Sequence, residues 1–401
     1  MRRQQYTITS SAIHEHAAAL CQKHLCLKDH GPKCTALTLL TLLFYAAARL
    51  ASLAAACASL SKAPSDTAVR TALMATLPLL HELQRRLNRA LQGDLPPALR
   101  RRRQPLAIDL TLLPYHGQPL HDANEVYRSQ AKDGTSHFHA YATAYVIRKG
   151  QRYTVALAYV RKGDDLAAVV KELLRQAAQA SVRPRYLLLD RGFYQVGVVR
   201  YLQAARHPFL MPVICRGRQL DDPRGPSGTN IFLIWKQSGW SEYTLREAQG
   251  RTATVSIGVK CRYYRGQWQR HGRQRLVYAF WALSPPSIDW VRQVYRLRFA
   301  IETTYRQMHQ ARIRTSTRDP LLRLLYVGVA LVLRNAWVWF HYQVLAWPVR
   351  GVVAGRSAWS CSGFGRCCCG WCMWPKRPWG HETRHLPICG CDQELRLSVT
   401  G

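Results

Sequence analysis

The order of strand-like and helix-like runs over residues 105–215 is the feature that most constrains the fold of this chain. A short apolar run around one acid, "LAIDLTLLPY", precedes two strand-like runs rich in β-branched and aromatic residues, joined by "RKGQ". A helical run, the strand "RYLLLD", a second helical run and the short strand "PFLMPVIC" follow. This β, β–β, α, β, α, β order predicts an α/β fold with a mixed sheet flanked by helices.

The segments on either side of this core differ from it in composition and in predicted secondary structure. Residues 1–92 are rich in Ala and Leu and predict a helical domain, either a plain bundle or a DNA-binding module. Residues 216–285 contain four strand-like runs, the first of them "NIFLIW", and predict a β-rich insertion. The pattern returns to helix after residue 285.

The charge of the chain indicates its partner. It carries 57 Lys and Arg against 23 Asp and Glu, a formal net charge of +34. Self-repulsion of this size opposes compaction unless a polyanion shares the surface. Nucleic acid is the expected partner, because each phosphate neutralised by Lys or Arg releases a counterion. A membrane surface is the alternative.

Two long apolar stretches, 36–60 and 321–347, have the length of membrane spans. Both contain interior arginines, and an arginine at the bilayer centre costs about 2.5–3.5 kcal/mol. We therefore expect buried helices and no membrane partner. The N-terminal stretch lacks the apolar region of a secretory signal, and six cysteines are scattered before residue 361. These features predict a reduced, cytoplasmic and nucleoid-associated protein.

Two acids occupy unusual places on the predicted strands. Asp109 lies in the middle of the apolar run "AIDLT", and Asp190 closes the strand "RYLLLD". Carboxylates are rarely buried unless they are paired or bound to metal, and open α/β sheets bind ligands beyond their strand ends. Taken alone, Asp109 fits an edge strand equally well, and Asp190 fits a turn that caps the next helix.

A third acid, Glu302, lies in a helix predicted over residues 294–309. Tyr295, Arg298, Glu302 and His309 fall within about 60° of one another on its surface. An adjacent apolar stripe with the same spacing is formed by Val294, Leu297, Ile301 and Met308. We expect the stripe to pack on the sheet and the polar row to lie at the rim; a solvated polar face is the alternative.

Carboxylates from two strands and one helix would form an oxygen-rich metal site. Mg²⁺ prefers such ligands, and two such ions stabilise the attacking and leaving oxygens of phosphodiester chemistry. In this interpretation Asp109 bridges both ions, Asp190 and Glu302 each hold one, and Mn²⁺ can substitute. Arg298 and Tyr295 would hold phosphate oxygens, a task that suits the guanidinium fork.

The motifs "AIDLTLLPYHG", "LLLDRGFY" and Tyr-x2-Arg-x3-Glu-x6 followed by a basic position resemble those of DDE transposases of the insertion-sequence-four type. The resemblance covers about residues 60–345, and its helix signature is its most specific part. It implies a ribonuclease H-like catalytic fold with a β-rich insertion. The predicted parts are a helical domain (1–92), a basic linker (93–104), the first part of the catalytic core (105–215), the insertion (216–285), the C-terminal helices of the core (286–348) and a Cys- and Trp-rich tail (349–401).

The resemblance also implies an activity. A metal-activated water nicks the transposon end, and the freed 3′-OH attacks the opposite strand and later the target DNA, within a synaptic complex that is expected to be a homodimer. Two alternatives stay open. One is a catalytically decayed transposase that only binds DNA, and the other is a ribonuclease H-like nuclease without strand transfer.

Basic residues around the site are expected to bind the DNA. The family signature ends in lysine, whereas this chain has histidine there, and Arg306, Arg312 or Arg314 would supply part of the charge. The expected DNA-binding residues are Tyr295, Arg298, His309, Lys132, Arg306 and Arg191.

The tail has an unusual composition. Seven of the 13 cysteines fall in the last 41 residues, and four tryptophans lie between Trp359 and Trp379. The cysteines could be zinc ligands together with His381 and His385. Their density and the absence of a helix or strand pattern favour another hypothesis, a frameshifted and disordered end that begins near residue 350.

Overall fold

The computed structural model describes residues 10–148, 152–265, 271–299, 308 and 311–340. The chain forms two compact units. The first joins the N-terminal residues up to Asp94 to the residues from Arg306 onward, and the second spans Leu95–Tyr305. The predicted tail, 349–401, lies outside the described residues.

The first unit is helical, as the sequence predicts for the N-terminal region. Its helices are α1 (Ser10–Leu25), α2 (Ala36–Ala48), α3 (Leu53–Ser59), α4 (Asp66–Thr76), α5 (Leu80–Gln92) and α11 (Pro320–Phe340). Hydroxyl side chains cap three of the N-termini. Thr35, Ser52 and Ser65 each accept a hydrogen bond from the backbone N–H three residues further on, which satisfies a donor that the helix itself leaves free.

Helix α11 is the central helix of this unit. By length and composition alone it could cross a membrane, but 83% of its apolar window is buried inside the structure. It packs against α1, α2 and α5. The helices α2 and α3 together also pass the membrane-span test, but they are bent by 105° at their junction. Protein contacts therefore account for the apolar surface of α11.

Helix α11 approaches α5 closely at Gly328. A Cβ atom added there would lie 2.4 Å from Cδ2 of Leu87 and 2.9 Å from its Cγ. Leu87 is fully buried, so its side chain has no room to withdraw. The glycine is thus a consequence of helix packing.

We expect Gly328→Ala to lower the free energy of unfolding by a net of about 1–2 kcal/mol, because overpacking outweighs the gain in helix propensity. Urea unfolding followed by circular dichroism measures it. Gly197→Ala in another helix is the matched control, since its Cβ would meet nothing closer than 3.9 Å. Equal stabilisation by both changes would show that α11 and α5 are not in this contact.

The second unit is built on a nine-stranded mixed sheet, which confirms the predicted fold class. Its strands are β1 (Gln104–Pro114), β2 (Tyr127–Lys132), β3 (Thr135–Val146), β4 (Thr154–Val160), β5 (Pro184–Leu189), β6 (Phe209–Pro212), β7 (Gly239–Arg246), β8 (Thr252–Arg265) and β9 (His271–Trp281). The order is β2-β3-β1-β5-β6-β9-β8-β7, and β4 also pairs with β3. The pairs β1–β5 and β5–β6 are parallel, and the others are antiparallel.

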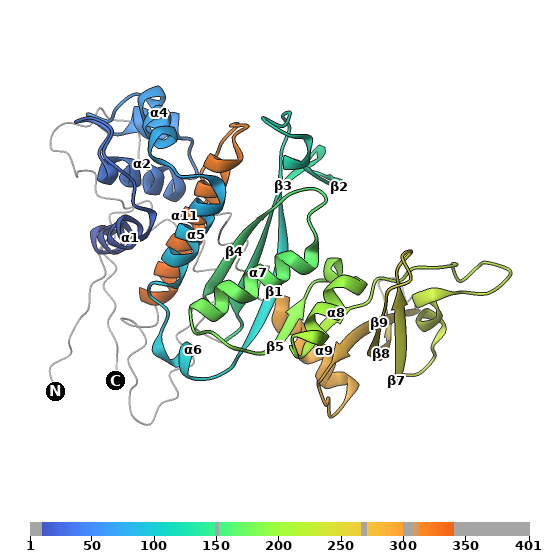
Figure 1. Cartoon of the computed structure of the whole chain (residues 1–401). Helices are drawn as coiled ribbons and strands as arrows, with labels where there is room; N and C mark the ends of the chain where they lie inside the picture. The colour runs from blue at the N-terminus through green and yellow to red at the C-terminus, as the bar shows by residue number, and fades with distance from the viewer. Residues whose placement is uncertain (1–9, 149–151, 266–270, 300–307, 309–310, 341–401) are drawn as a thin grey trace. The chain divides into compact units, whose positions relative to one another are not determined.

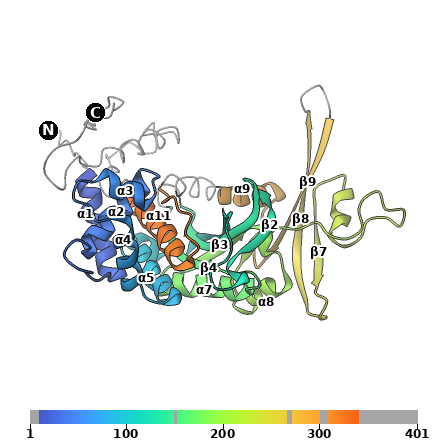
Figure 2. The ribbon, with the colours of Figure 1, turned by 90° about the horizontal axis from the view of Figure 1, so that it is seen from above.

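Helices cover both faces of this sheet (Figures 1 and 2). Helix α7 (Leu166–Gln179) starts at Asp165, whose carboxylate accepts a hydrogen bond from Ala167, and it packs on β3 and β4. Helix α8 (Val196–Ala204) lies beside α7. Helix α9 (Ile288–Arg296) contacts β6 and β8 and lies on the opposite face.

The predicted insertion differs from the structure in two respects. Its strands β7 to β9 continue the main sheet, because β9 pairs with β6. The run "NIFLIW" is not a strand; its first five residues belong to the 3-10 helix η3 (Gly228–Ile234), and Trp235 follows that helix. Bonds from Asn230 to the carbonyls of Gly217 and Arg218 hold η3 against the preceding loop. The basic linker also contains a short helix, α6 (Pro97–Arg101).

Candidate active site

The two predicted aspartates occupy adjacent places on neighbouring strands. Strand β1 pairs in parallel with β5, with Ile108 opposite Leu189; Asp109 follows Ile108 on β1, and Asp190 directly follows the end of β5. Residues opposite each other in a sheet direct their side chains to the same face. The parallel register therefore brings together two carboxylates that are far apart in sequence.

The surroundings of both aspartates decide between the interpretations left open by the sequence. Asp109 is 8% exposed, and β1 lies between β3 and β5 in the interior of the sheet, so Asp109 is not on an edge strand. One of its oxygens accepts the backbone N–H of Leu110 at 2.9 Å. Asp190 stands before the 3-10 helix η2 (Arg191–Phe193), but its side chain makes no capping hydrogen bond. A place on an edge strand therefore does not explain Asp109, and a helix-capping role does not explain Asp190.

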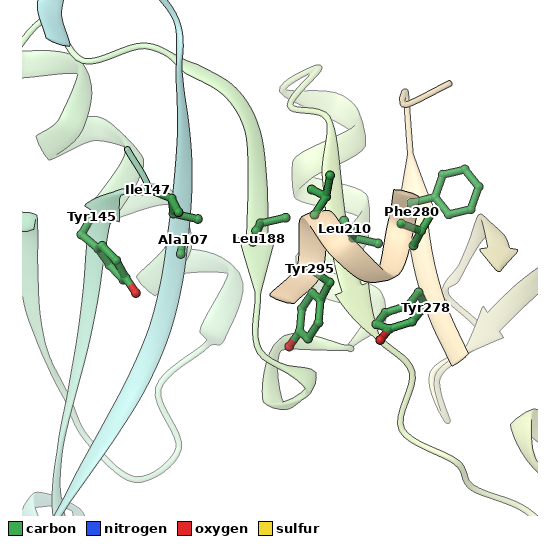
Figure 3. Packing of buried hydrophobic residues seen from close by; sticks show 10 residues of the cluster. Ala107, Tyr145, Ile147, Leu188, Leu210, Tyr278, Phe280 and Tyr295 are labelled. Carbon is green, nitrogen blue, oxygen red and sulfur yellow. The ribbon is translucent and has the colours of Figure 1, made fainter. Parts of the chain in front are cut away.

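Helix α9 packs on the same face of the sheet as the two carboxylates. Its Val291, Val294 and Tyr295 form a core cluster with Ala107 of β1 and Leu188 of β5. Figure 3 shows Ala107 and Leu188 on their strands, with Tyr295 beside Tyr278 of β9; the two tyrosine rings are 5.3 Å apart. Side chains two residues apart on a strand share a face. Asp109 and Asp190 thus continue the surface on which α9 lies.

Arg298, three residues after Tyr295, bridges the two aspartates. Its guanidinium nitrogens lie 3.3 Å from Oδ2 of Asp109 and 3.1 Å from Oδ1 of Asp190. Its Cζ atom is 5.3 Å from the centre of the Tyr295 ring. Only 9% of the Arg298 side chain is exposed, against 11% for Asp109 and 38% for Asp190. The Asp109 pair is therefore well shielded, whereas water screens the Asp190 pair.

The electrostatic surroundings keep Arg298 charged. Burial alone would lower its pKa, but Tyr295, Asp109 and Asp190 outweigh burial, and the pKa of Arg298 is raised. For Tyr295, burial acts in the opposite direction and raises the pKa of the phenol, and the positive charge of Arg298 lowers that pKa only in part. The site thus contains a neutral phenol and a cation held between two carboxylates.

The chain around Arg298 departs from the predicted helix. Helix α9 ends at Arg296, and the 3-10 helix η5 (Leu297–Phe299) follows. Leu297 was expected in the packed apolar stripe but is 48% exposed, whereas Tyr295 and Arg298 were expected at the rim and are 4% and 7% exposed. Because residues three apart align in a 3-10 turn, the tightening places Arg298 directly after Tyr295 along the packed face.

Of the other predicted site residues, the structure describes only Lys132 and Arg191. Glu302, Arg306 and His309 lie outside the described residues. Lys132 is exposed at the end of β2, which β3 separates from β1. Arg191 is exposed and directly follows Asp190. The structure therefore brings together Asp109, Asp190, Tyr295 and Arg298.

The donor groups of this cluster suit a divalent metal ion. Two carboxylates on one face supply the oxygen ligands that Mg²⁺ and Mn²⁺ prefer. A guanidinium already lies within 3.3 Å of both carboxylates, so this position favours positive charge. Among the described residues no group of three His, Cys, Asp or Glu is gathered, and Glu302, the predicted third ligand, lies outside them.

Residues 100–331, more than half of the chain, match the family described as "Transposase DDE domain". The chain belongs to this transposase family. The matched segment contains Asp109, Asp190 and Arg298 and ends within α11, at residue 331. No curated protein sequence matches this transposase.

A solved structure shares the fold of this transposase. It is the cryo-EM structure of a piggyBac transposase synaptic complex with hairpin DNA, with a TM-score of 0.52 over 94% of this chain and 85% of that chain. The sequence identity is 11%, so the similarity concerns the fold alone. It agrees with the predicted ribonuclease H-like sheet flanked by helices.

Proposed function

We propose that this transposase cuts the ends of its own insertion sequence and joins them to target DNA by phosphodiester hydrolysis and strand transfer, as an enzyme of the insertion-sequence-four type. The observation that carries the proposal is the convergence of Asp109 and Asp190 on one face of the sheet, under the guanidinium of Arg298. Glu302 is the proposed third carboxylate.

The proposed metal ligands are Asp109, Asp190 and Glu302, with Mg²⁺ as the metal and Mn²⁺ as its substitute. A bound divalent ion would lower the pKa of an attacking water and offset the charge that develops on the phosphate. The buried position of Asp109 and its bond to Leu110 fix one carboxylate before any substrate arrives. A fixed group costs no reorganisation during the reaction.

Arg298 and Tyr295 would act on the substrate phosphate. A charged guanidinium at the site can donate two parallel hydrogen bonds to phosphate oxygens. Its contact with the Tyr295 ring, and the packing of that ring in the core cluster, hold the guanidinium in place. Water has little access to a side chain that is 9% exposed, which strengthens its interaction with an anion.

DNA is the proposed partner, both as transposon ends and as target. The net charge of +34 favours a polyanion, and the similar piggyBac structure is described as a synaptic complex with hairpin DNA. We further propose a homodimer in the synaptic complex, a cytoplasmic, nucleoid-associated location, and DNA contacts at Lys132, Arg191, Arg306 and His309.

Metal removal provides the direct test. We expect the full chain to nick a labelled fragment carrying the element's own ends in Mg²⁺ or Mn²⁺, and to give no product in EDTA, because hydrolysis needs the metal. Hairpin or joined products on a gel would separate a transposase from a nuclease without strand transfer. Binding without any cleavage in either metal would favour the decayed, DNA-binding alternative.

A further inference from the structure

Seven arginines gather at one end of the sheet, away from the two aspartates. Strands β1, β5 and β6 are parallel and begin at this end, and the antiparallel β3 finishes there beside β1. The seven are exposed, lie at or close to these strand ends, and together form the arginine edge: Arg101, Arg102, Arg103, Arg148, Arg183, Arg185 and Arg206.

Backbone hydrogen bonds join the segments of the arginine edge. The N–H of Gln104 donates to the carbonyl of Arg183 at 2.8 Å, which ties the start of β1 to the start of β5. On the other side of β1, the N–H of Ile147 donates to the carbonyl of Pro105 at 2.9 Å and brings Arg148 to the same end. Segments that are far apart in the sequence therefore lie next to one another here.

A buried glutamine holds the run of arginines before β1 in place. The side-chain amide of Gln104, which is 4% exposed, donates to the carbonyls of Ala98, Leu99 and Arg102 at 3.3, 3.4 and 2.9 Å. These carbonyls lie in α6 or directly after it, where a helix leaves its last acceptors unbonded. The chain then runs from α6 straight into β1 (Figure 1). The backbone that carries these arginines is thus fixed before any ligand binds.

No carboxylate balances the arginine edge. The segments that form it contain no Asp or Glu, since none stands in 95–108, 134–163, 173–189 or 191–220. Within the described part of the chain, none of the seven side chains forms an ion pair or a hydrogen bond. Other exposed arginines of the same unit pair with acids, as Arg175, Arg224 and Arg251 do. The arginine edge is therefore an unpaired cationic surface.

Other features of the fold do not neutralise this charge. Helices α7 and α8 end shortly before β5 and β6, and a helix C-terminus carries about half a negative charge. Two such termini offset about one of the seven positive charges. The remaining charge acts on its neighbours: the pKa of His207 is lowered, first by burial and then by the charge of Arg103. Unbalanced charge of one sign destabilises the folded chain unless an anion binds to it.

The dimensions of the arginine edge suit a nucleic-acid duplex. The strands follow one another in the order β3-β1-β5-β6. Neighbouring strands are about 4.8 Å apart, so the four strand ends span about 14 Å, close to the width of about 12 Å that separates the phosphate backbones across the major groove. All seven cations are arginines, and a guanidinium can donate two parallel hydrogen bonds to one phosphate.

The arginine edge and the aspartates lie at different levels of the same strands. Asp109 follows Arg103 by six residues, and Asp190 follows Arg183 by seven. At a rise of about 3.3 Å per residue, about 20 Å of strand separates the arginines from the carboxylates. A phosphate bound at the arginine edge is therefore not the phosphate that reacts at the aspartates.

We propose that the arginine edge binds the phosphate backbone of a second DNA duplex, without regard to its sequence, while the aspartates act on the first. Contacts to phosphate alone carry no sequence information, so they hold the transposase on DNA and take no part in cleavage. The proposal rests on the proposed function for the identity of the polyanion, because that function brings DNA to this chain.

Fluorescence anisotropy in EDTA over a series of salt concentrations tests the proposal with a labelled duplex that carries no transposon end. The edge variant combines three changes: Arg103→Gln, Arg183→Gln and Arg206→Gln. The control variant removes the same charge from three exposed arginines that pair with acids: Arg175→Gln, Arg224→Gln and Arg251→Gln. We expect the edge variant to bind at least about tenfold more weakly and to lower the salt slope by about 2–3, which is about 0.9 for each lost phosphate contact. Equal affinities and slopes of the two variants would overturn the proposal.

Two further measurements separate DNA binding from simpler roles of these arginines. The melting temperature of the edge variant should stay the same or rise, because charge repulsion has been removed. If it falls, lysine at the same three positions decides the matter: the lysine variant should keep the wild-type salt slope, and a slope as low as that of the glutamine variant would overturn the proposal. Vesicles of phosphatidylglycerol are the competing surface. Loss of vesicle binding in the edge variant, with duplex binding kept, would also overturn it.

A capture experiment tests whether the second duplex is separate from the first. The full chain, bound in EDTA to a transposon end on beads, should retain a labelled duplex of unrelated sequence. The edge variant should still bind the beads but retain at least about tenfold less of the second duplex. Equal loss of both duplexes would mean that they share one binding path, and the second site would be wrong.

The outcome does not depend on cleavage. If the chain cuts no DNA in Mg²⁺ but the edge variant still loses its salt slope, the proposed function fails and the duplex site stands. If the wild type cuts DNA and the edge variant binds the unrelated duplex as the control does, the duplex site is wrong and the proposed function stands.

Discussion

Replacing Asp109 by asparagine is expected to reduce cleavage of a labelled transposon end by at least about 10²–10³-fold, the loss that follows removal of one electrostatic stabiliser in other enzymes. Asparagine has the shape of aspartate and can still accept the N–H of Leu110, so the strand should keep its geometry. What disappears is one negative charge at the proposed metal site. DNA affinity, measured by anisotropy in EDTA, should equal or exceed that of the wild type, because an acid that repels phosphate has been removed.

The same loss is expected for Asp190→Asn and for Glu302→Gln. Asp289→Asn is a matched control, because this carboxylate in the first turn of α9 pairs with Lys260 and is remote from the Asp109 pair. It should cut at the wild-type rate. If any one of the three site variants cuts normally in Mg²⁺, the proposed set of three carboxylates is wrong. If a site variant loses cleavage and DNA binding together, the measurement reports a folding defect.

The sequence predicted the sheet because its signals there are local and redundant. The runs that became β1, β3, β4, β5 and β6 are apolar, rich in β-branched or aromatic residues, and bounded by turn residues. The proximity of Asp109 and Asp190 followed from their positions on strands of such a sheet, since both stand where apolar residues would be expected. The structure adds the register that makes them neighbours.

Helical periodicity could not decide how wide the buried face of α9 is, because the structure buries Val294 of the predicted stripe and Tyr295 of the predicted polar row together. The row beginning at Tyr295 and the stripe beginning at Val294 have identical spacing, and sequence alone favoured the more apolar of the two. The structure buries Tyr295 because its ring packs against Tyr278 of β9, a strand that the sequence assigned to a separate insertion. The change to a 3-10 turn at Leu297 then exposes that leucine. The pairing of β9 with β6, which are far apart in the sequence, therefore decided the burial of Tyr295, and the local apolar pattern did not.

The structure of the run "NIFLIW" also could not be predicted from its local sequence. Its apolar, β-branched composition is typical of a strand, yet Thr229, directly before it, bonds to the Arg216 loop. Fixed hydrogen bonds to that loop take the place of a neighbouring strand. No local signal in the run itself reveals those partners.

Replacing Arg298 by methionine is expected to lower the free energy of unfolding in EDTA by about 3 kcal/mol, because it leaves Asp109 buried without its cation. The Asp109 pair accounts for this loss, since the more exposed Asp190 pair is screened by water. Urea unfolding followed by circular dichroism measures the loss. Arg296→Met is the matched control, an exposed arginine in the last turn of α9 that should change stability little.

Divalent ions should reverse much of the Arg298→Met defect. In the proposed site the guanidinium and a metal ion would compete for the same oxygens of Asp109 and Asp190, so removing the guanidinium should tighten Mg²⁺ binding. Ligand that binds only the folded state stabilises it in proportion to the logarithm of its concentration over Kd. The melting temperature of the variant should therefore rise more in Mg²⁺ than that of the wild type. If Mg²⁺ stabilises both equally, Arg298 and the metal do not compete for these carboxylates, and this prediction is wrong.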